Sequence, residues 1–152
     1  MATFEILPGV APGGFVVSNF TAAVVDAGQS PTNIIRATDQ FAVEVKWTTS
    51  GPLSAHLPGN WHVFAFLESI GTGPDFDFNA DVSPIPLTPG AGDINYTAKV
   101  TVPANTVKIP PGHPREAMPM KLVVTVTYDW GANNPGPMAG FIEMPVVLFF
   151  NP

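Results

Sequence analysis

Large apolar residues alternate one by one with small or polar residues along three stretches of this chain. The segment 41–47 reads FAVEVKW, and the same alternation returns over 94–102 and 122–128, where threonines fill several intervening positions. Successive side chains of a strand point to opposite faces of a sheet, so a period of two residues marks a strand with one face on a core. The pattern therefore predicts three half-buried strands.

Further segments carry weaker strand signals, and the connections between them are rich in proline and glycine. These segments are 3–7, 15–25, 33–37, 61–69 and 141–150. No stretch keeps a helical period, and 18 prolines leave little uninterrupted room for a helix. Seven or eight short strands separated by turns predict an all-β fold. We expect an antiparallel β-sandwich of Greek-key, immunoglobulin-like architecture, with residues 1–152 in one domain.

The segment 60–68, NWHVFAFLE, is largely apolar on both of its alternating faces. The face opposite Trp61 carries four residues: His62, Phe64, Phe66 and Glu68. His62 and Glu68 lie about 20 Å apart along an extended strand, too far to touch, so we interpret them as polar ends of a core strand. A strand that is apolar on both faces needs cover from a loop or a neighbouring subunit.

The last twelve residues, 141–152, are apolar at nearly every position and end on three large side chains before Asn151. Pro145 has no N–H to donate to a neighbouring strand, which favours an edge or bulged position for this segment. Such a strand invites a partner. We therefore expect a protein contact surface that includes four residues: Phe64, Phe66, Leu148 and Phe149.

Charged residues make up only 12% of the chain, against about 25% in an ordinary globular protein. The net charge is −6, and the six basic residues are scattered singly along the sequence. Nucleic-acid binding and attachment to an anionic membrane both need clustered Lys and Arg, so neither is expected. A surface so short of charge is neutral polar or apolar, and exposed apolar patches commonly mark protein contacts.

The chain has no cysteine, which excludes disulfides, thiolate catalysis and cysteine-ligated metals. Its first residues lack a basic segment followed by a continuous apolar run, so no signal peptide is visible. No apolar run approaches the roughly 20 residues that span a bilayer as a helix. The sequence thus predicts a soluble protein, cytoplasmic by default.

The motifs of common enzymes are missing from the sequence. The three histidines, His56, His62 and His113, show no zinc-type spacing, and His113 falls in a proline-rich loop. Nucleophile elbow, phosphate-binding loop and dinucleotide fingerprint are all absent. We expect no cofactor and no enzymatic activity, although a hydrolase with a dispersed site stays open as an alternative.

An acidic stretch offers a weak calcium candidate. Four oxygen-bearing residues stand at alternate positions: Asp75, Asp77, Asn79 and Asp81. The resemblance to an EF-hand loop ends at Ala80 and Pro86, where that loop needs glycine and glutamate. We favour acids that face water from an extended segment, and no metal site.

The segment 128–137, YDWGANNPGP, joins two expected strands. Its candidate binding residues are Asp129, Trp130, Asn133 and Asn134. A tryptophan beside such polar groups can stack on a sugar ring while the polar groups bind its hydroxyls, which predicts a possible carbohydrate ligand. The alternative, which we favour, is that Trp130 folds back as a lid over the core.

Taken together, these features predict a non-enzymatic β-sandwich that acts through protein contacts, as a subunit of a homo-oligomer or larger assembly. A carbohydrate-type binding module that uses the Trp130 loop is the alternative, and a hydrolase is the second alternative.

Overall fold

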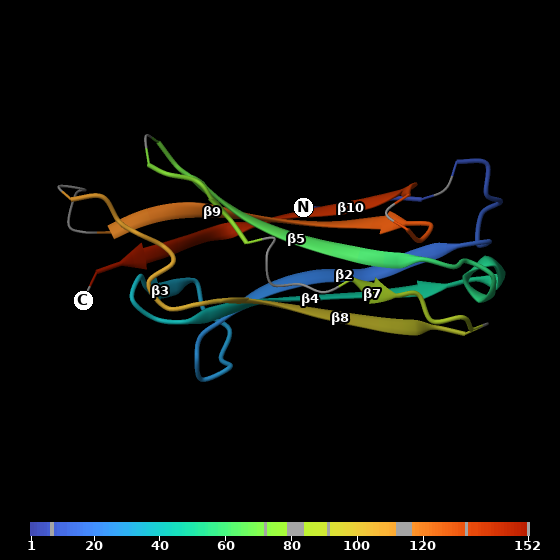
Figure 1. The fold of residues 1–152 in the computed structure, drawn as a ribbon, viewed down its shortest axis with the longest axis horizontal. Coiled ribbons are helices and arrows are strands. Elements are labelled where there is room, and N and C mark those ends of the chain that lie inside the picture. Colours follow the sequence, from blue (N-terminus) through green and yellow to red (C-terminus); the bar gives the residue numbers. More distant parts are fainter. Residues whose placement is uncertain are drawn as a thin grey trace.

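Two layers of strands lie face to face along the long axis of the molecule (Figure 1). The computed structural model describes residues 1–6, 8–71, 73–78, 84–90, 92–111, 117–132 and 134–151. In Figure 1, β5, β9 and β10 form one layer, and β2, β4 and β8 form the other. This arrangement confirms the predicted all-β class and the sandwich of two sheets.

The larger sheet has seven strands in the order β1-β10-β9-β5-β6, with β3 beside β10 and β7 beside β5. They are β1 (Ala2–Glu5), β3 (Ile34–Arg36), β5 (Asn60–Ser69), β6 (Phe76–Asp77), β7 (Ile85–Pro86), β9 (Ala117–Asp129) and β10 (Pro135–Phe150). β3 runs parallel to β10, and the other pairs described in this sheet are antiparallel.

The smaller sheet has three antiparallel strands in the order β2-β4-β8. They are β2 (Val16–Val25), β4 (Phe41–Ser50) and β8 (Ile94–Val102), and a single 3-10 turn, η1 (Pro52–Ala55), follows β4. The described residues thus form ten strands, not seven or eight, because β6 and β7 have only two residues each, too short to show a period. The immunoglobulin-like detail and the single domain stay predictions.

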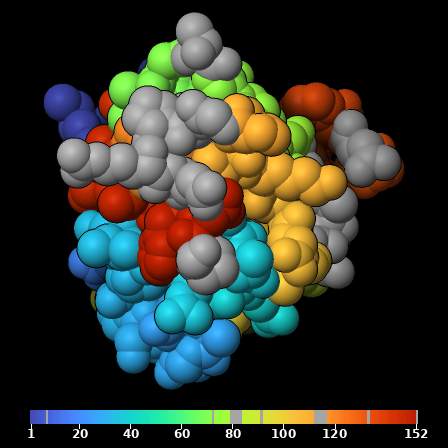
Figure 2. Space-filling model, turned by 90° about the vertical axis from the view of Figure 1, so that its left-hand side faces the viewer, coloured from blue at the N-terminus to red at the C-terminus, as the bar shows by residue number. Residues whose placement is uncertain are grey.

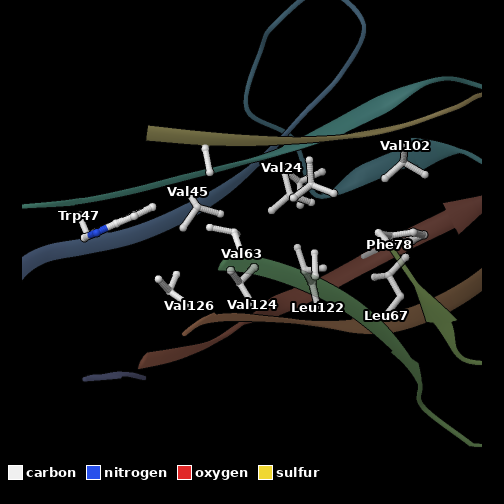
Figure 3. Close-up of a cluster of buried hydrophobic side chains, with 14 of the residues drawn as sticks. Val24, Val45, Trp47, Val63, Leu67, Phe78, Val102, Leu122, Val124 and Val126 are labelled. Carbon is white, nitrogen blue, oxygen red and sulfur yellow. The ribbon is translucent and has the colours of Figure 1, made fainter. Parts of the chain in front are cut away.

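The core lies between the two sheets and uses every second residue of the long strands. Val45 of β4 faces Val63 of β5 and Val124 of β9, and all three side chains are almost completely buried (Figure 3). Burying one such valine or leucine contributes about 1.5–3 kcal/mol. The apolar residues of the alternating segments therefore form the interior of the sandwich.

A cluster of large aromatic side chains fills the core near the start of β5. Trp47 stacks on Tyr96 with ring centroids 5.4 Å apart, and Trp61 meets Trp47 edge-on at 6.0 Å. Tyr128 lies 5.5 Å from Trp61, and its hydroxyl donates a hydrogen bond to the backbone oxygen of Pro58. Through Tyr128, this cluster packs against the inner side of the last residues of β9.

The prediction for β10 was half right. Its bulge is confirmed, because Pro145 falls in a register shift between Glu143 and Val146. The edge position is wrong, since β10 pairs with β9 on one side and with β1 and β3 on the other. β1 pairs with residues 139–142 and β3 with 148–150, so the proline lies opposite the interval between two short strands. A missing N–H costs little there.

The end of β10 is held by the segment around β3. The backbone N–H of Ala37 donates to the backbone oxygen of Phe150 at 2.9 Å. The backbone N–H of Leu148 donates to the backbone oxygen of Asn33 at 2.8 Å. Figure 2 views this end of the sandwich, where the red C-terminal segment lies between the cyan chain that follows β3 and the amber chain that follows β8. The last strand is therefore built into the fold.

Candidate functional site

The outward side chains of the larger sheet form an extended apolar surface. Eight residues make up this apolar outer face: Ile34, Phe64, Phe66, Val123, Phe141, Val146, Leu148 and Phe150. Ile34 is 62% exposed, Val146 48% and Phe141 43%, while the other five are half-buried. Polar residues lie among them, since the strand register puts Thr125 between Phe64 and Phe141. A surface that exposes several large apolar side chains is typical of a contact site.

Lys121 offsets part of the acidic charge at the centre of this face. Lys121 of β9 forms an ion pair with Glu143 of β10 at 2.9 Å, and Glu68 of β5 stands beside Lys121 in the strand register. The hydrogen bond from Lys121 and its positive charge lower the pKa of Glu143 below its usual value. The carboxylate of Glu143 therefore stays ionised and paired at neutral pH.

The structure places the expected contact residues on two different sides of the larger sheet. Phe64, Phe66 and Leu148 belong to the apolar outer face, with part of each side chain exposed. Phe149 must be corrected: it is fully buried, points into the core and packs against Phe41 at 5.4 Å. It cannot reach a partner, because adjacent residues of a strand face opposite ways.

The outer face of the smaller sheet is different in kind. Most of its outward residues on β2, β4 and β8 are polar or small: Ser18, Thr21, Ala23, Glu44, Lys46, Thr48, Asn95, Thr97, Lys99 and Thr101. Thr48 donates a hydrogen bond to Asn95 at 2.8 Å and accepts one from Asn19 at 3.3 Å. Such a surface is well suited to contact with water.

His62 has a partner that the sequence did not reveal. The Nε2 of His62 hydrogen-bonds the Oδ2 of Asp129, which lies 67 residues away in the chain and is brought near by the pairing of β5 with β9. The other oxygen of Asp129 accepts from Asn60 at 3.3 Å and from the N–H of Gly131 at 2.6 Å. Glu68, at the far end of β5, takes no part.

These contacts explain the electrostatics of Asp129. The hydrogen bond from His62 is the main reason that its pKa lies below the ordinary value, and Gly131 and Asn60 act in the same direction against the effect of burial. Burial raises the pKa of the neighbouring Tyr128, and the charge of Asp129 raises it further. The aspartate is thus an ionised acceptor saturated by protein donors, although its side chain is only 7% exposed.

Within the described residues, the His62–Asp129 pair has neither a triad nucleophile nor further metal ligands beside it. Among the described residues, no serine or threonine hydroxyl hydrogen-bonds His62, as the nucleophile of a catalytic triad would. Within the same part of the chain, no group of three His, Cys, Asp or Glu side chains could hold a metal ion. The geometry favours a structural role in which Asp129 holds the ring of His62 and the turn at Gly131 in place.

A hollow of about 390 Å³ lies beside this pair. Its lining residues are His62, Phe64, Thr127, Tyr128, Asp129, Pro135, Gly136 and Met138. β9 and β10 lose register between the pairs Pro135–Asp129 and Ala139–Thr127, because β10 has two more residues than β9 between them. The extra residues bend β10 away from its neighbour and open the hollow.

The Trp130 loop uses its polar groups internally. The ring of Trp130, 39% exposed, packs edge-on against Tyr128 at 5.1 Å. The backbone N–H of Trp130 donates to the backbone oxygen of Asn134 at 2.9 Å. Gly131, with φ at +100°, makes the turn and engages Asp129. Asn133 lies outside the described residues. The packing of Trp130 on Tyr128 resembles the expected lid more than an open sugar platform.

The acidic stretch is described only in part. Asp75 and Asp77 are exposed, Phe78 is buried, and Asp75 accepts a hydrogen bond from the N–H of Ser69 at 2.9 Å. Asn79 and Asp81, the other two calcium candidates, lie outside the described residues, as does His113. For Asp75 this local hydrogen bond agrees with the structural interpretation of the acids.

Within the described part of the chain, no helix is long and apolar enough to cross a membrane. The sequence matches no protein-family model, and no curated protein is detectably similar to it.

Proposed function

We propose that this chain is a non-enzymatic assembly subunit that pairs with a second copy of itself through the apolar outer face of the larger sheet. The observation that carries the proposal is the exposure of Ile34, Phe141 and Val146 on a face that already contains three half-buried phenylalanines. Burying a large apolar side chain contributes about 1.5–3 kcal/mol, so a few such residues can sustain association.

The size of the face supports a second copy as the partner. The seven strands of the larger sheet contain 50 residues, and at about 3.3 Å along and about 4.8 Å across per residue they cover a footprint on the order of 800 Å². A stable protein interface buries about 800 Å² on each partner. Two copies of this face, related by a two-fold axis, would meet that requirement with the same surface on both sides.

The distribution of charge also supports pairing through this face. Two chains that each carry a net charge of −6 repel one another unless their contact surfaces are locally neutral. The central charges of the apolar outer face are the paired Lys121 and Glu143, together with Glu68 beside Lys121. Lys121 therefore offsets acidic charge in the middle of the proposed interface.

A pair of matched substitutions tests the proposal. Val146→Asp places a charge on the apolar outer face, at a side chain that is 48% exposed and outside the core. Val16→Asp is the control, because Val16 is 37% exposed on the outer face of the smaller sheet. Sedimentation should give at least twice the 16.1 kDa chain mass for the native protein and for Val16→Asp. Val146→Asp should sediment as a single chain.

Circular dichroism must first establish that both variants are folded. Equal masses for the two folded variants would contradict an interface on the larger sheet, whichever mass was found.

A further inference from the structure

The geometry points to a ligand site in the hollow beside His62, and we infer that it binds a small uncharged aromatic molecule that carries an N–H or O–H donor. The walls of the site all come from one chain, and Phe64 belongs both to these walls and to the proposed interface. The site differs from the Trp130 loop, since Trp130 packs on Tyr128 and does not line the hollow.

The walls combine apolar surface with few polar groups. Phe64, Tyr128, Pro135 and Met138 supply ring, aliphatic and thioether surface, and His62 and Thr127 supply the polar groups. Small-molecule sites are typically concave and mostly apolar, with a small number of placed polar groups. Thioether sulfur and proline both pack well on aromatic rings, which favours an aromatic guest.

The rings of His62 and Phe64 are arranged to hold a planar group. They are parallel to within 10°, and their centroids lie 6.4 Å apart because the two residues are neighbours on one face of β5. That distance lies within the range of a stacked aromatic pair, and it is shorter than the ~7 Å that a ring inserted between them needs for two stacking contacts of about 3.5 Å. A flat guest therefore enters between the two rings when Phe64 turns aside, because the hydrogen bond with Asp129 holds His62 in place.

The hydrogen bond with Asp129 determines which nitrogen of His62 can accept a hydrogen bond from a ligand. An ionised carboxylate only accepts, so the Nε2 of His62 carries the proton shared with Asp129. In the tautomer with its proton on Nε2, the imidazole has its lone pair on Nδ1. An N–H or O–H of the ligand can donate to this nitrogen, which gives the aromatic guest a defined orientation.

Size and charge restrict the ligand further. A cavity of about 150 Å³ accommodates benzene, so 390 Å³ has room for two fused rings. The carboxylate of Asp129 and the net charge of −6 both disfavour an anionic guest. The site thus selects neutral rings about the size of indole.

Indole is a suitable probe, and the methyl group of Met138 is a suitable reporter. Met138 is 1% exposed and lines the hollow, whereas Met118 and Met120 lie in the core at the other end of β9. In methyl NMR of the intact protein, indole should shift the Met138 signal saturably, with a dissociation constant in the millimolar range expected for so small a ligand. The signals of Met118 and Met120 should move far less.

Three ligand controls define the chemistry of the site. Cyclohexanol has a donor but no planar ring, benzoate has the ring but a negative charge, and N-methylindole has the rings without the N–H. Each should bind about threefold to tenfold more weakly than indole, as expected for the loss of one aromatic or hydrogen-bonding contact.

Phe64→Leu and Phe66→Leu form the matched protein variants. Both residues are half-buried on the same face of β5, but only Phe64 lines the hollow. Phe64→Leu should weaken indole binding about tenfold, and Phe66→Leu should leave it unchanged. The proposal would be overturned by the absence of a saturable Met138 shift or by equal binding of indole and N-methylindole. Equal affinities in the two folded variants would overturn it as well.

Discussion

On their inner sides, β4 of the smaller sheet and β9 of the larger sheet both present a row of buried apolar residues, but their outer sides differ. Outward from β4 stand Glu44, Lys46 and Thr48, whereas the larger sheet exposes valine, isoleucine and phenylalanine around a single ion pair. A sheet needs only one apolar face to join a sandwich. The sandwich does not need the exposed apolar residues on the outer side of the larger sheet, which supports the proposed association.

The strongest test of this comparison uses two phenylalanines on the same strand. Phe149 is fully buried, so Phe149→Ala should lower the free energy of unfolding by about 3–5 kcal/mol. Phe141 is 43% exposed on the apolar outer face, and Phe141→Ala should cost the isolated chain less than about 1 kcal/mol. Denaturant titration at low protein concentration measures both. Similar losses would mean that β10 does not separate a core face from an outer face.

A second test compares the polar clusters on the two outer faces. Asp129→Asn removes the charge that accepts hydrogen bonds from His62, Asn60 and Gly131, and such charge-assisted bonds are about twice as strong as neutral ones. The variant should be less stable at neutral pH, by less than Phe149→Ala. Thermal unfolding at pH 7 measures this difference, and an unchanged midpoint would contradict the structural role of Asp129.

The pH dependence of stability sharpens the same comparison. The folded-state pKa of Asp129 is lowered, so its contribution is complete above the unfolded-state pKa of about 4 and is lost as the pH falls through the lower, folded-state value. Glu143 adds to the same acid limb because Lys121 lowers its pKa. Asp129→Asn should therefore flatten part of the decline below about pH 4, measured by unfolding at successive pH values. An identical acid limb in the variant would argue against this account.

The smallest effect is expected at the neutral cluster of the smaller sheet. Thr48 is 6% exposed, and Thr48→Val removes its hydrogen bonds with Asn95 and Asn19. The loss should be about 0.5–1.5 kcal/mol. It should be the same at pH 5 and pH 8, since none of these three groups titrates. A clear dependence on pH in that range would show that a charged group takes part in this cluster.

Much of the fold followed from the sequence because alternation is a local property. The segments 41–47, 94–102 and 122–128 lie within β4, β8 and β9, and their apolar positions form the core. The sequence also indicated that β5 is apolar on both faces. The same rule failed at the end of β10, where Leu148 and Phe149 are both apolar and nothing local shows which of them points inward.

The candidate site was harder to predict because it depends on strand pairing. The sequence singles out His62 and Asp129 separately, but they meet only because β5 pairs with β9 in one particular register. The hollow beside them depends on the lost register between β9 and β10, which no local pattern specifies. The segment 128–137 was expected to join two strands, whereas its last three residues belong to the irregular start of β10.

The central claim, that the apolar outer face of the larger sheet pairs two copies, is tested most directly by the mass of the native protein in solution. Sedimentation equilibrium over a range of micromolar concentrations should give at least twice the chain mass of 16.1 kDa, with dissociation only on dilution. A folded protein that keeps the mass of one chain at every concentration would contradict the claim.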